Sequence, residues 1–227
     1  MTVVELENVR RFYETAGEVV RALDGVSLSI EKGEFVAIAG PSGSGKSTLL
    51  NMVGALDIPD EGQLKIADKD LGKMSRKERA ELRRDTLGFV FQAYNLIPVL
   101  TVMENVEYVQ MLQGVDKATR RARSAEVLTQ VGLDGMFNRR PNELSGGQQQ
   151  RVAVARAIAS EPALVLADEP TANLDSSTSE ALLDTMADLN REHGVTFVFA
   201  THDPRVMSRA TRLIQLVDGK IQSDEKR

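Results

Sequence analysis

One stretch restricts the fold of this chain more than any other, the run GPSGSGKST at residues 40–48. It fits the phosphate-binding pattern G-x-x-x-x-G-K-[ST], with an apolar strand-forming run at 35–39 before it and a helix-forming run at 49–53 after it. The glycines allow successive N–H groups to face phosphate oxygens, and the helix presents its positive end. A flexible Gly/Ser loop is the alternative, but such a loop does not require that strand and helix. The sequence therefore predicts a nucleoside triphosphate site in an α/β fold.

Two side chains of this loop carry specific chemistry. Lys46 is expected to reach the β- and γ-phosphates, and the Ser47 hydroxyl is expected to bind Mg²⁺. The predicted nucleotide-binding residues of the loop are Gly40, Ser42, Gly43, Ser44, Gly45, Lys46, Ser47 and Thr48.

Composition limits the remaining choices. The chain has 227 residues, a length that suits one large domain or a core with one insertion. Its net charge of −5 does not indicate a nucleic-acid groove, because such domains are usually strongly basic. The absence of cysteine excludes disulfides and thiolate metal sites and fits a cytosolic location.

We see no signal peptide, and the apolar runs are far shorter than the ~20 residues of a membrane helix, so another chain is expected to cross any membrane involved.

The pattern of apolar residues predicts the architecture. Residues 3–31 alternate as strands of a small β-layer, whereas 35–39, 164–167 and 195–200 are apolar on both faces and alternate with helices. Such strands favour a parallel sheet covered on both sides. Capping boxes at Ser75 and Thr101 predict helix starts, helical periodicity continues to about Leu144, and further helices are expected over 149–159 and 178–192. A tight hairpin turn is expected at 217–220.

Two adjacent carboxylates, Asp168 and Glu169, end the apolar strand at 163–167. At the carboxyl edge of a parallel sheet these acids would lie beside the phosphate loop. Asp168 is then expected to hold Mg²⁺ through a water, and Glu169 to orient and deprotonate the attacking water. The alternative is a surface turn with two exposed acids.

The run LSGGQ at 144–148 is a second turn of small residues that leads directly into a helix. Its free N–H groups, helix N-terminus and serine hydroxyl suit an anion. Either this turn is an ordinary helix cap, or it serves a nucleotide bound elsewhere.

LSGGQ behind the phosphate loop and ahead of the strand that ends in Asp168 and Glu169 resembles the ABC ATPase family, and these motifs cover nearly the whole chain in the family's order. The resemblance implies the P-loop NTPase fold of the ABC ATPase type, a mostly parallel sheet with an N-terminal antiparallel β-layer and an inserted helical subdomain. It implies one ABC ATPase domain over 1–227, with an α/β core at 1–91 and 145–227 and a helical subdomain at 92–144. It further implies ATP and Mg²⁺ as cofactors and a head-to-tail dimer with a second copy of the chain. Leu144, Ser145, Gly146, Gly147 and Gln148 would then act on the partner's nucleotide.

Smaller family positions are also present. The resemblance implies that Gln92 contacts Mg²⁺, that His202 contacts the γ-phosphate and that Asp175 crosses the dimer interface, although Asp175 could instead cap the following helix. Tyr13 matches the aromatic that stacks on adenine, but an N-terminal aromatic is often only core. His193 is expected to lie at the C-terminus of a helix and to have no chemical role. The predicted catalytic residues are Lys46, Glu169 and His202, and the predicted metal-binding residues are Ser47, Gln92 and Asp168.

Longer segments such as GFVFQAYNLIP at 88–98 and LSGGQQQRV at 144–152 resemble the branch of lipoprotein-release and macrolide-export ATPases, with the cell-division ATPase of FtsX-type membrane proteins a close relative. That branch implies a cytoplasmic subunit held on the inner face of the membrane by a permease with a large extracytoplasmic domain.

We expect part of the apolar cluster Leu96, Ile97, Val99, Leu100, Val102 and Met103 to form a groove for a permease helix, although the cluster could instead be the core of the helical subdomain. A soluble ABC ATPase acting on DNA or the ribosome and an ATP-binding scaffold in cell division remain the alternatives.

Overall fold

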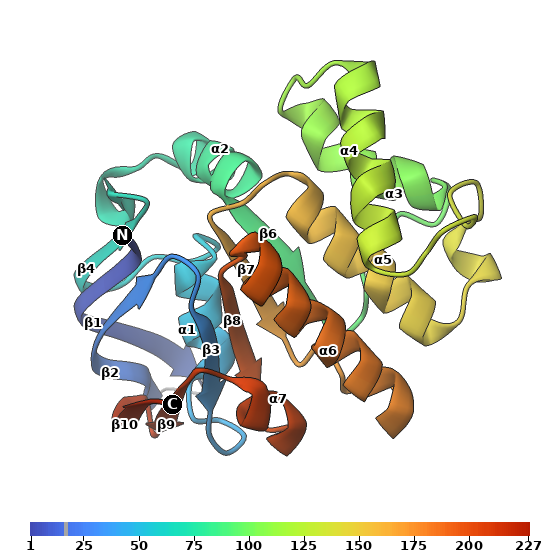
Figure 1. Cartoon of the computed structure of the whole chain (residues 1–227). Helices are drawn as coiled ribbons and strands as arrows, with labels where there is room; N and C mark the ends of the chain where they lie inside the picture. Colours follow the sequence, from blue (N-terminus) through green and yellow to red (C-terminus); the bar gives the residue numbers. More distant parts are fainter. Residues whose placement is uncertain (16–17) are drawn as a thin grey trace.

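The computed structural model describes residues 1–15 and 18–227, and over these residues its strands form two sheets (Figure 1). The strands are β1 (Thr2–Thr15), β2 (Glu18–Glu31), β3 (Phe35–Ala39), β4 (Glu61–Ile66), β5 (Lys69–Asp70), β6 (Leu87–Val90), β7 (Leu164–Asp168), β8 (Phe197–Thr201), β9 (Arg212–Val217) and β10 (Lys220–Lys226). The helices are α1 (Lys46–Val53), α2 (Arg76–Thr86), α3 (Val102–Leu112), α4 (Lys117–Gln130), α5 (Gly146–Ala159), α6 (Ser176–His193) and α7 (Pro204–Arg209), with short 3-10 turns η1 (Leu71–Lys73) and η2 (Pro141–Glu143).

The larger sheet has the strand order β10-β9-β3-β8-β7-β6. Strands β9, β3, β8, β7 and β6 are parallel, and β10 pairs with β9 in the antiparallel sense. The expected parallel sheet is therefore confirmed. The expected hairpin turn between β9 and β10 is also present, and it places Asp218 and Gly219 in the left-handed region.

Alternate side chains of the parallel strands enter different apolar clusters on the two faces of this sheet. Phe197 and Phe199 of β8 pack with residues of α3 to α7, whereas Val198 and Ala200 pack with α1 and the strands of the smaller sheet. Helices and a second sheet therefore cover the two faces, which explains why these strands are apolar throughout.

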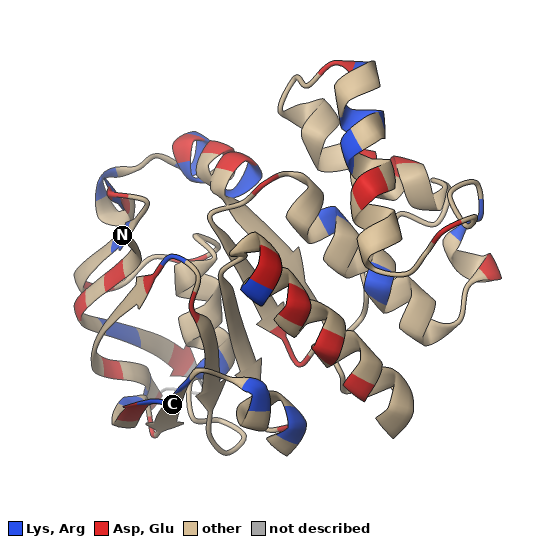
Figure 2. Cartoon of the chain, viewed as in Figure 1, with Lys and Arg blue, Asp and Glu red and all other residues tan. Residues whose placement is uncertain are grey.

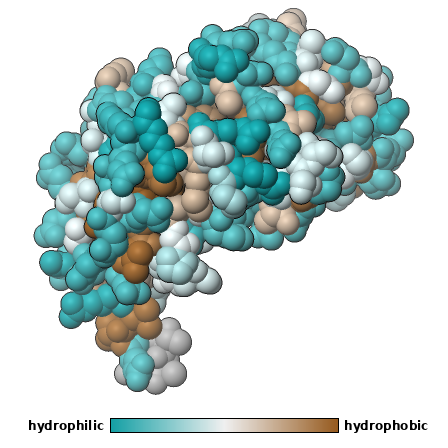
Figure 3. Space-filling view, turned by 60° about the horizontal axis from the view of Figure 1, so that its bottom comes forward, coloured by the Kyte–Doolittle hydropathy of each residue, from teal (hydrophilic) through white to brown (hydrophobic). Residues whose placement is uncertain are grey.

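The smaller sheet has the order β2-β1-β4-β5, with antiparallel pairing throughout, as the alternation at 3–31 predicts. In the space-filling view the β1–β2 hairpin projects from the body as an arm with hydrophobic surface near its end (Figure 3). Val19 and Val20 of β2 are exposed there.

The helices begin where the sequence places caps. Capping boxes start α2 after Ser75 and α3 after Thr101, as expected. Helix α5 begins at Gly146 rather than at 149, because the Ser145 side chain accepts the N–H of Gln148 and so caps the helix one turn earlier. Helix α5 contacts α3, α4, α6 and β6. Within the described residues, no helix is long and apolar enough to cross a membrane.

One buried cation joins the two sheets. The Arg212 guanidinium on β9 donates hydrogen bonds to Asp224 of β10 at 2.7 Å, to Glu34 at 2.8 Å and to the Ser29 carbonyl of β2 at 2.8 Å. The hydrogen bonds to Asp224, with the charge of Glu34, outweigh burial and raise the pKa of Arg212. The cation is therefore a cross-link between strands distant in sequence.

We predict that Arg212→Met lowers the free energy of unfolding by about 3 kcal/mol, the low end of what breaking a buried ion pair costs, because Asp224 and Glu34 lose their buried cationic partner. Urea unfolding measures this difference. The matched control is Arg191→Met on α6, whose exposed ion pairs are expected to contribute no more than ~0.5 kcal/mol. Equal losses in the two variants would contradict the assignment of a cross-link to Arg212.

Candidate nucleotide-binding site

Three neighbouring parallel strands end at one pocket. The phosphate loop follows β3, Glu169 follows β7 and His202 follows β8, and β8 pairs with both other strands. The pocket has a volume of about 810 Å³ and brings together most of the predicted residues of the site. Those that line it are Tyr13, Gly40, Ser42, Gly43, Gly45, Lys46, Ser47, Thr48, Gln92, Asp168, Glu169 and His202.

The loop owes its shape to close backbone contacts. A Cβ added to Gly45, whose φ is +102°, would lie 2.3 Å from the Ala22 carbonyl oxygen of β2, so glycine is required there. Lys46 begins α1, and its Nζ donates to the carbonyl oxygens of Gly40 at 2.7 Å and Pro41 at 2.8 Å. The ammonium group therefore lies over the loop.

Ser44 differs from the other predicted loop residues in its surroundings. Its side chain is buried, and it does not line the pocket. Its N–H donates to Pro41 O at 3.2 Å and its carbonyl accepts the N–H of Gly219 at 3.0 Å. This residue therefore links the loop to the β9–β10 turn.

The three residues predicted to bind Mg²⁺, Ser47, Gln92 and Asp168, line the same pocket. Burial, followed by the charge of Glu169, raises the pKa of Asp168, and the nearby Lys46 acts in the opposite direction. Asn173 holds the backbone of Gln92, because its Nδ2 donates to the main-chain carbonyl oxygen of Gln92 at 2.9 Å. Hydroxyl, amide and carboxylate oxygens are the donors that a hard divalent cation prefers, so this set fits Mg²⁺.

Glu169 has a strained backbone, and both oxygens of its carboxylate have partners within the chain. Its φ is +45°, and its N–H donates to the Ala200 carbonyl at 3.0 Å. Its Oε1 lies 2.6 Å from Nδ1 of His202, and its Oε2 accepts the Thr201 hydroxyl at 3.1 Å. The His202 side chain is 76% exposed, so it can reach a ligand in the pocket.

Tyr13 lies at the wall of the pocket, and the guanidinium of Arg11 stands 4.8 Å from the centre of its ring. Its hydroxyl donates to Asp57 at 3.1 Å. The pocket is also lined by Pro41, Val20, Arg21, Ala22 and Asp218, which the sequence does not single out. Val20 pairs with Tyr13 across the β1–β2 hairpin, so the hairpin register could have revealed it.

The turn 144–148 and Asp175 do not line this pocket. The Ser145 and Asp175 side chains cap α5 and α6. Hydrogen bonds from the Thr178 side chain and backbone, and from Ser177, lower the pKa of Asp175. A Cβ on Gly147 would lie 2.2 Å from Cγ2 of Thr178, so the two caps are packed against each other.

Comparison with known proteins agrees with this arrangement. The ABC transporter family matches residues 23–172. The ABC transporter ATP-binding protein MJ0796 of Methanocaldococcus jannaschii is 46% identical over 99% of this chain and 97% of that protein. The lipoprotein-releasing system ATP-binding protein LolD of Anaeromyxobacter dehalogenans is 46% identical over 97% of this chain and 93% of that protein. The macrolide export ATP-binding/permease protein MacB of Hyphomonas neptunium is 47% identical over 98% of this chain, which spans 34% of that protein.

A solved structure shares the fold as well as the sequence. A dimeric structure of MJ0796 in a post-hydrolysis state, bound to ADP and Pi, matches with a TM-score of 0.89 at 46% identity over 98% of each chain. A phosphate loop and a strand ending in two carboxylates at one edge of a parallel sheet define a P-loop ATPase. The chain belongs to the ABC transporter family, as an ATP-binding subunit that hydrolyses ATP. The expected fold and activity are confirmed.

We predict that Asp168→Asn raises the stability of the protein without added nucleotide at neutral pH. The raised pKa means that folding disfavours the charged carboxylate, so the gain is largest above the folded pKa. The gain should vanish as the pH falls below the ordinary aspartate pKa of 3.8, where the carboxyl is protonated in both states. Thermal unfolding across this pH range measures it. The exposed Asp188→Asn on α6 is the control, and an equal gain in both variants would contradict the prediction.

Proposed function

We propose that this chain is the ATP-hydrolysing subunit of an ABC transporter, that ATP joins two copies head to tail, and that the dimer drives a permease of the FtsX/MacB-like kind carried on another chain. The cargo class would be lipoprotein, peptide or drug. One observation carries the proposal. The phosphate loop, Asp168 and Glu169 of a single chain line one pocket, but the LSGGQ turn of the same chain lies outside it. In the proposed dimer, a second copy supplies this turn.

Dimerisation is supported by the form of the turn. Ser145 is exposed, and the first N–H groups of α5 have no partner within the helix. Together they suit the γ-phosphate of a nucleotide in the partner's pocket. The dimeric structure of the similar protein MJ0796, with ADP and Pi bound, supports the same assembly here.

Within the pocket we assign roles by chemistry. Lys46 binds the β- and γ-phosphates, Glu169 orients and deprotonates the attacking water, and His202 contacts the γ-phosphate. Mg²⁺, held by Ser47, Gln92 and, through water, Asp168, would neutralise phosphate charge when bound. Tyr13 stacks on adenine, and Asp175 contacts the partner subunit.

A groove beside the helical subdomain, which we assign to 92–144, is proposed to receive the permease. Its volume is about 460 Å³, and its apolar lining includes Leu56, Phe89, Ile97, Tyr108 and Leu112. Of the cluster expected from sequence, Ile97 lines this groove and Val99 is exposed, but Val102 and Met103 are buried in the core. Exposed apolar side chains gathered around a hollow favour a partner helix.

The groove connects to the catalytic pocket through the segment after Gln92. Arg156 of α5 lines the groove and donates to the carbonyl oxygens of Asn95 at 2.6 Å and Tyr94 at 3.1 Å. A segment fixed to the wall of the groove therefore continues directly into a residue that lines the nucleotide pocket, a route by which the permease could sense hydrolysis.

The identity of the permease rests on relatives. LolD and MacB are named for lipoprotein release and macrolide export, and both are about as similar to this chain as MJ0796. Association with the inner face of the membrane through that permease follows from the proposal, and nucleic acid is not expected as a partner.

We predict that Glu169→Gln binds ATP, hydrolyses it ~10²- to 10⁴-fold more slowly and elutes as a dimer on gel filtration with ATP, because only the water-activating group is lost. Lys46→Ala should instead lose nucleotide affinity and remain a monomer. An unaltered rate in Glu169→Gln would remove Glu169 as the base.

We predict that Leu112→Glu abolishes co-purification with the permease from detergent-solubilised membranes of the host, because a carboxylate would enter the apolar groove. ATP binding should be unchanged. Met111→Glu is the matched control, since Met111 is exposed on the same helix but does not line the groove. Recovery of the wild-type protein with ribosomes or DNA would favour the soluble ATPase alternative.

A further inference from the structure

Both carboxylate oxygens of Glu169 are tied to the end of β8. Oε1 accepts the backbone N–H of His202 at 3.2 Å and contacts its Nδ1, while Oε2 accepts the hydroxyl of Thr201 at 3.1 Å. Thr201 is fully buried and is the last residue of the strand. His202 is largely exposed, so the buried anchor of this carboxylate is the threonine.

The direction of the Thr201 hydroxyl is fixed by its partners. The backbone N–H of Asp203 donates to Thr201 Oγ1 at 2.9 Å, and an N–H group can only donate. The hydroxyl proton is thus left for the carboxylate, which in its ionised form can only accept. A β-branched side chain has few rotamers, so the Thr201 hydroxyl loses little conformational entropy when it points at Glu169.

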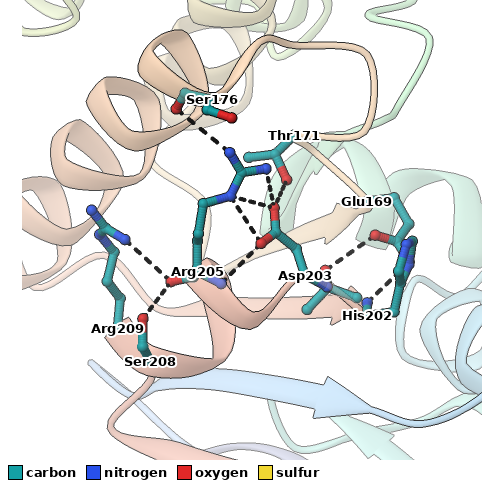
Figure 4. A network of polar contacts seen from close by, with 9 residues as sticks. Glu169, Thr171, Ser176, His202, Asp203, Arg205, Ser208 and Arg209 are labelled. Atoms are coloured by element: carbon teal, nitrogen blue, oxygen red, sulfur yellow. Dashed lines mark hydrogen bonds and ion pairs between the residues drawn. The ribbon is translucent and has the colours of Figure 1, made fainter.

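A second layer of contacts holds Asp203 itself (Figure 4). Its carboxylate accepts the Thr171 hydroxyl at 2.8 Å and the Arg205 guanidinium at 2.7 Å. Burial would raise the pKa of Asp203, but the hydrogen bonds from Arg205 and Thr171 prevail and lower it to about 2. In Figure 4 Arg205 reaches from Asp203 toward Ser176, the first residue of α6, whose carbonyl it contacts at 3.5 Å. The segment that orients Thr201 is therefore braced from two sides.

We propose that Thr201 is a positioning residue for ATP hydrolysis, because its hydroxyl, oriented by the braced Asp203 segment, holds the Glu169 carboxylate toward the pocket. The proposal rests on the role of Glu169 as the water-activating base, proposed above. Thr201 does not line the nucleotide pocket, so it acts through Glu169 rather than on ATP.

Removing the Thr201 hydroxyl should therefore lower the rate of ATP hydrolysis without changing the affinity for ATP. Thr201→Val keeps the volume and the branched shape, but it leaves Oε2 of Glu169 without a donor and the Asp203 N–H without an acceptor. We expect kcat to fall ~10-fold or more, because small displacements of a reacting group cost that much, while KM and the affinity for ATP stay at their wild-type values. Thr201→Ser restores the donor and should recover most of the rate.

The control is Thr196→Val, at the residue immediately before β8. Thr196 is also buried, and its hydroxyl accepts the Gly33 N–H at 2.9 Å, away from the pocket. A loss of stability alone would affect both variants, whereas a loss of kcat is expected only at Thr201. Steady-state ATPase assays and thermal unfolding of the full chain separate the two effects.

A double-mutant cycle with Glu169→Gln completes the test under single turnover. Since Thr201 acts through Glu169, Thr201→Val should add no further loss in the Glu169→Gln background. A full additional loss, or a kcat for Thr201→Val equal to that of Thr196→Val, would overturn the positioning role while leaving Glu169 as the base. A wild-type rate in Glu169→Gln alone would instead overturn the proposed function, and the two failures are thereby distinguished.

Discussion

The close fit of the phosphate loop between two sheets is the constraint on which the rest of the site depends. A Cβ on Gly40 would lie 2.0 Å from the Leu216 carbonyl oxygen of β9, and one on Gly45 would lie 2.3 Å from the Ala22 carbonyl oxygen of β2. Backbone therefore meets backbone on both sides of the loop, which only glycine permits. This fit fixes the loop at the edge where β7 and β8 also end, so Asp168, Glu169 and His202 line one pocket with the loop because the sheet brings them there.

Much of this arrangement is predictable from sequence because it is local. The phosphate loop, Glu169 and His202 each follow directly from a strand, and the ends of adjacent parallel strands meet. Capping boxes likewise predicted the first residues of α2 and α3. A strand end and a cap are set by neighbours within a few positions, so one sequence suffices to find them.

Features that depend on register or on side-chain direction were not predictable in this way. Val20 and Arg21 line the pocket only because β2 pairs with β1 across several register shifts, which residue types do not specify. Ser44 matches the loop pattern, yet it is buried and does not line the pocket. The buried Arg212 cross-link joins residues separated by up to 183 positions and leaves no local pattern.

The two readings of the LSGGQ turn, helix cap or half-site for a partner, are compatible in physical terms. The Ser145 hydroxyl accepts the Gln148 N–H as a cap, and this leaves its proton free to donate to an oxygen outside the chain. The N–H groups of Gly146 and Gly147 belong to the first turn of α5, where helices leave donors unpaired. A cap is therefore compatible with the anion binding proposed for this turn.

Several charged or polar groups of the site are ordered by contacts within the chain. Lys46 Nζ donates to two loop carbonyls, and a phosphate can displace these because its oxygens carry negative charge whereas the carbonyl oxygens are neutral. The Glu169 carboxylate differs, because its Oε2 is held by a buried hydroxyl of the sheet and its Oε1 by backbone and ring nitrogens of His202. The conformational entropy of this carboxylate is then lost when the sheet folds rather than when ATP binds. In the proposed mechanism, the free energy of ATP binding is then not needed to order this carboxylate and can act on dimer closure.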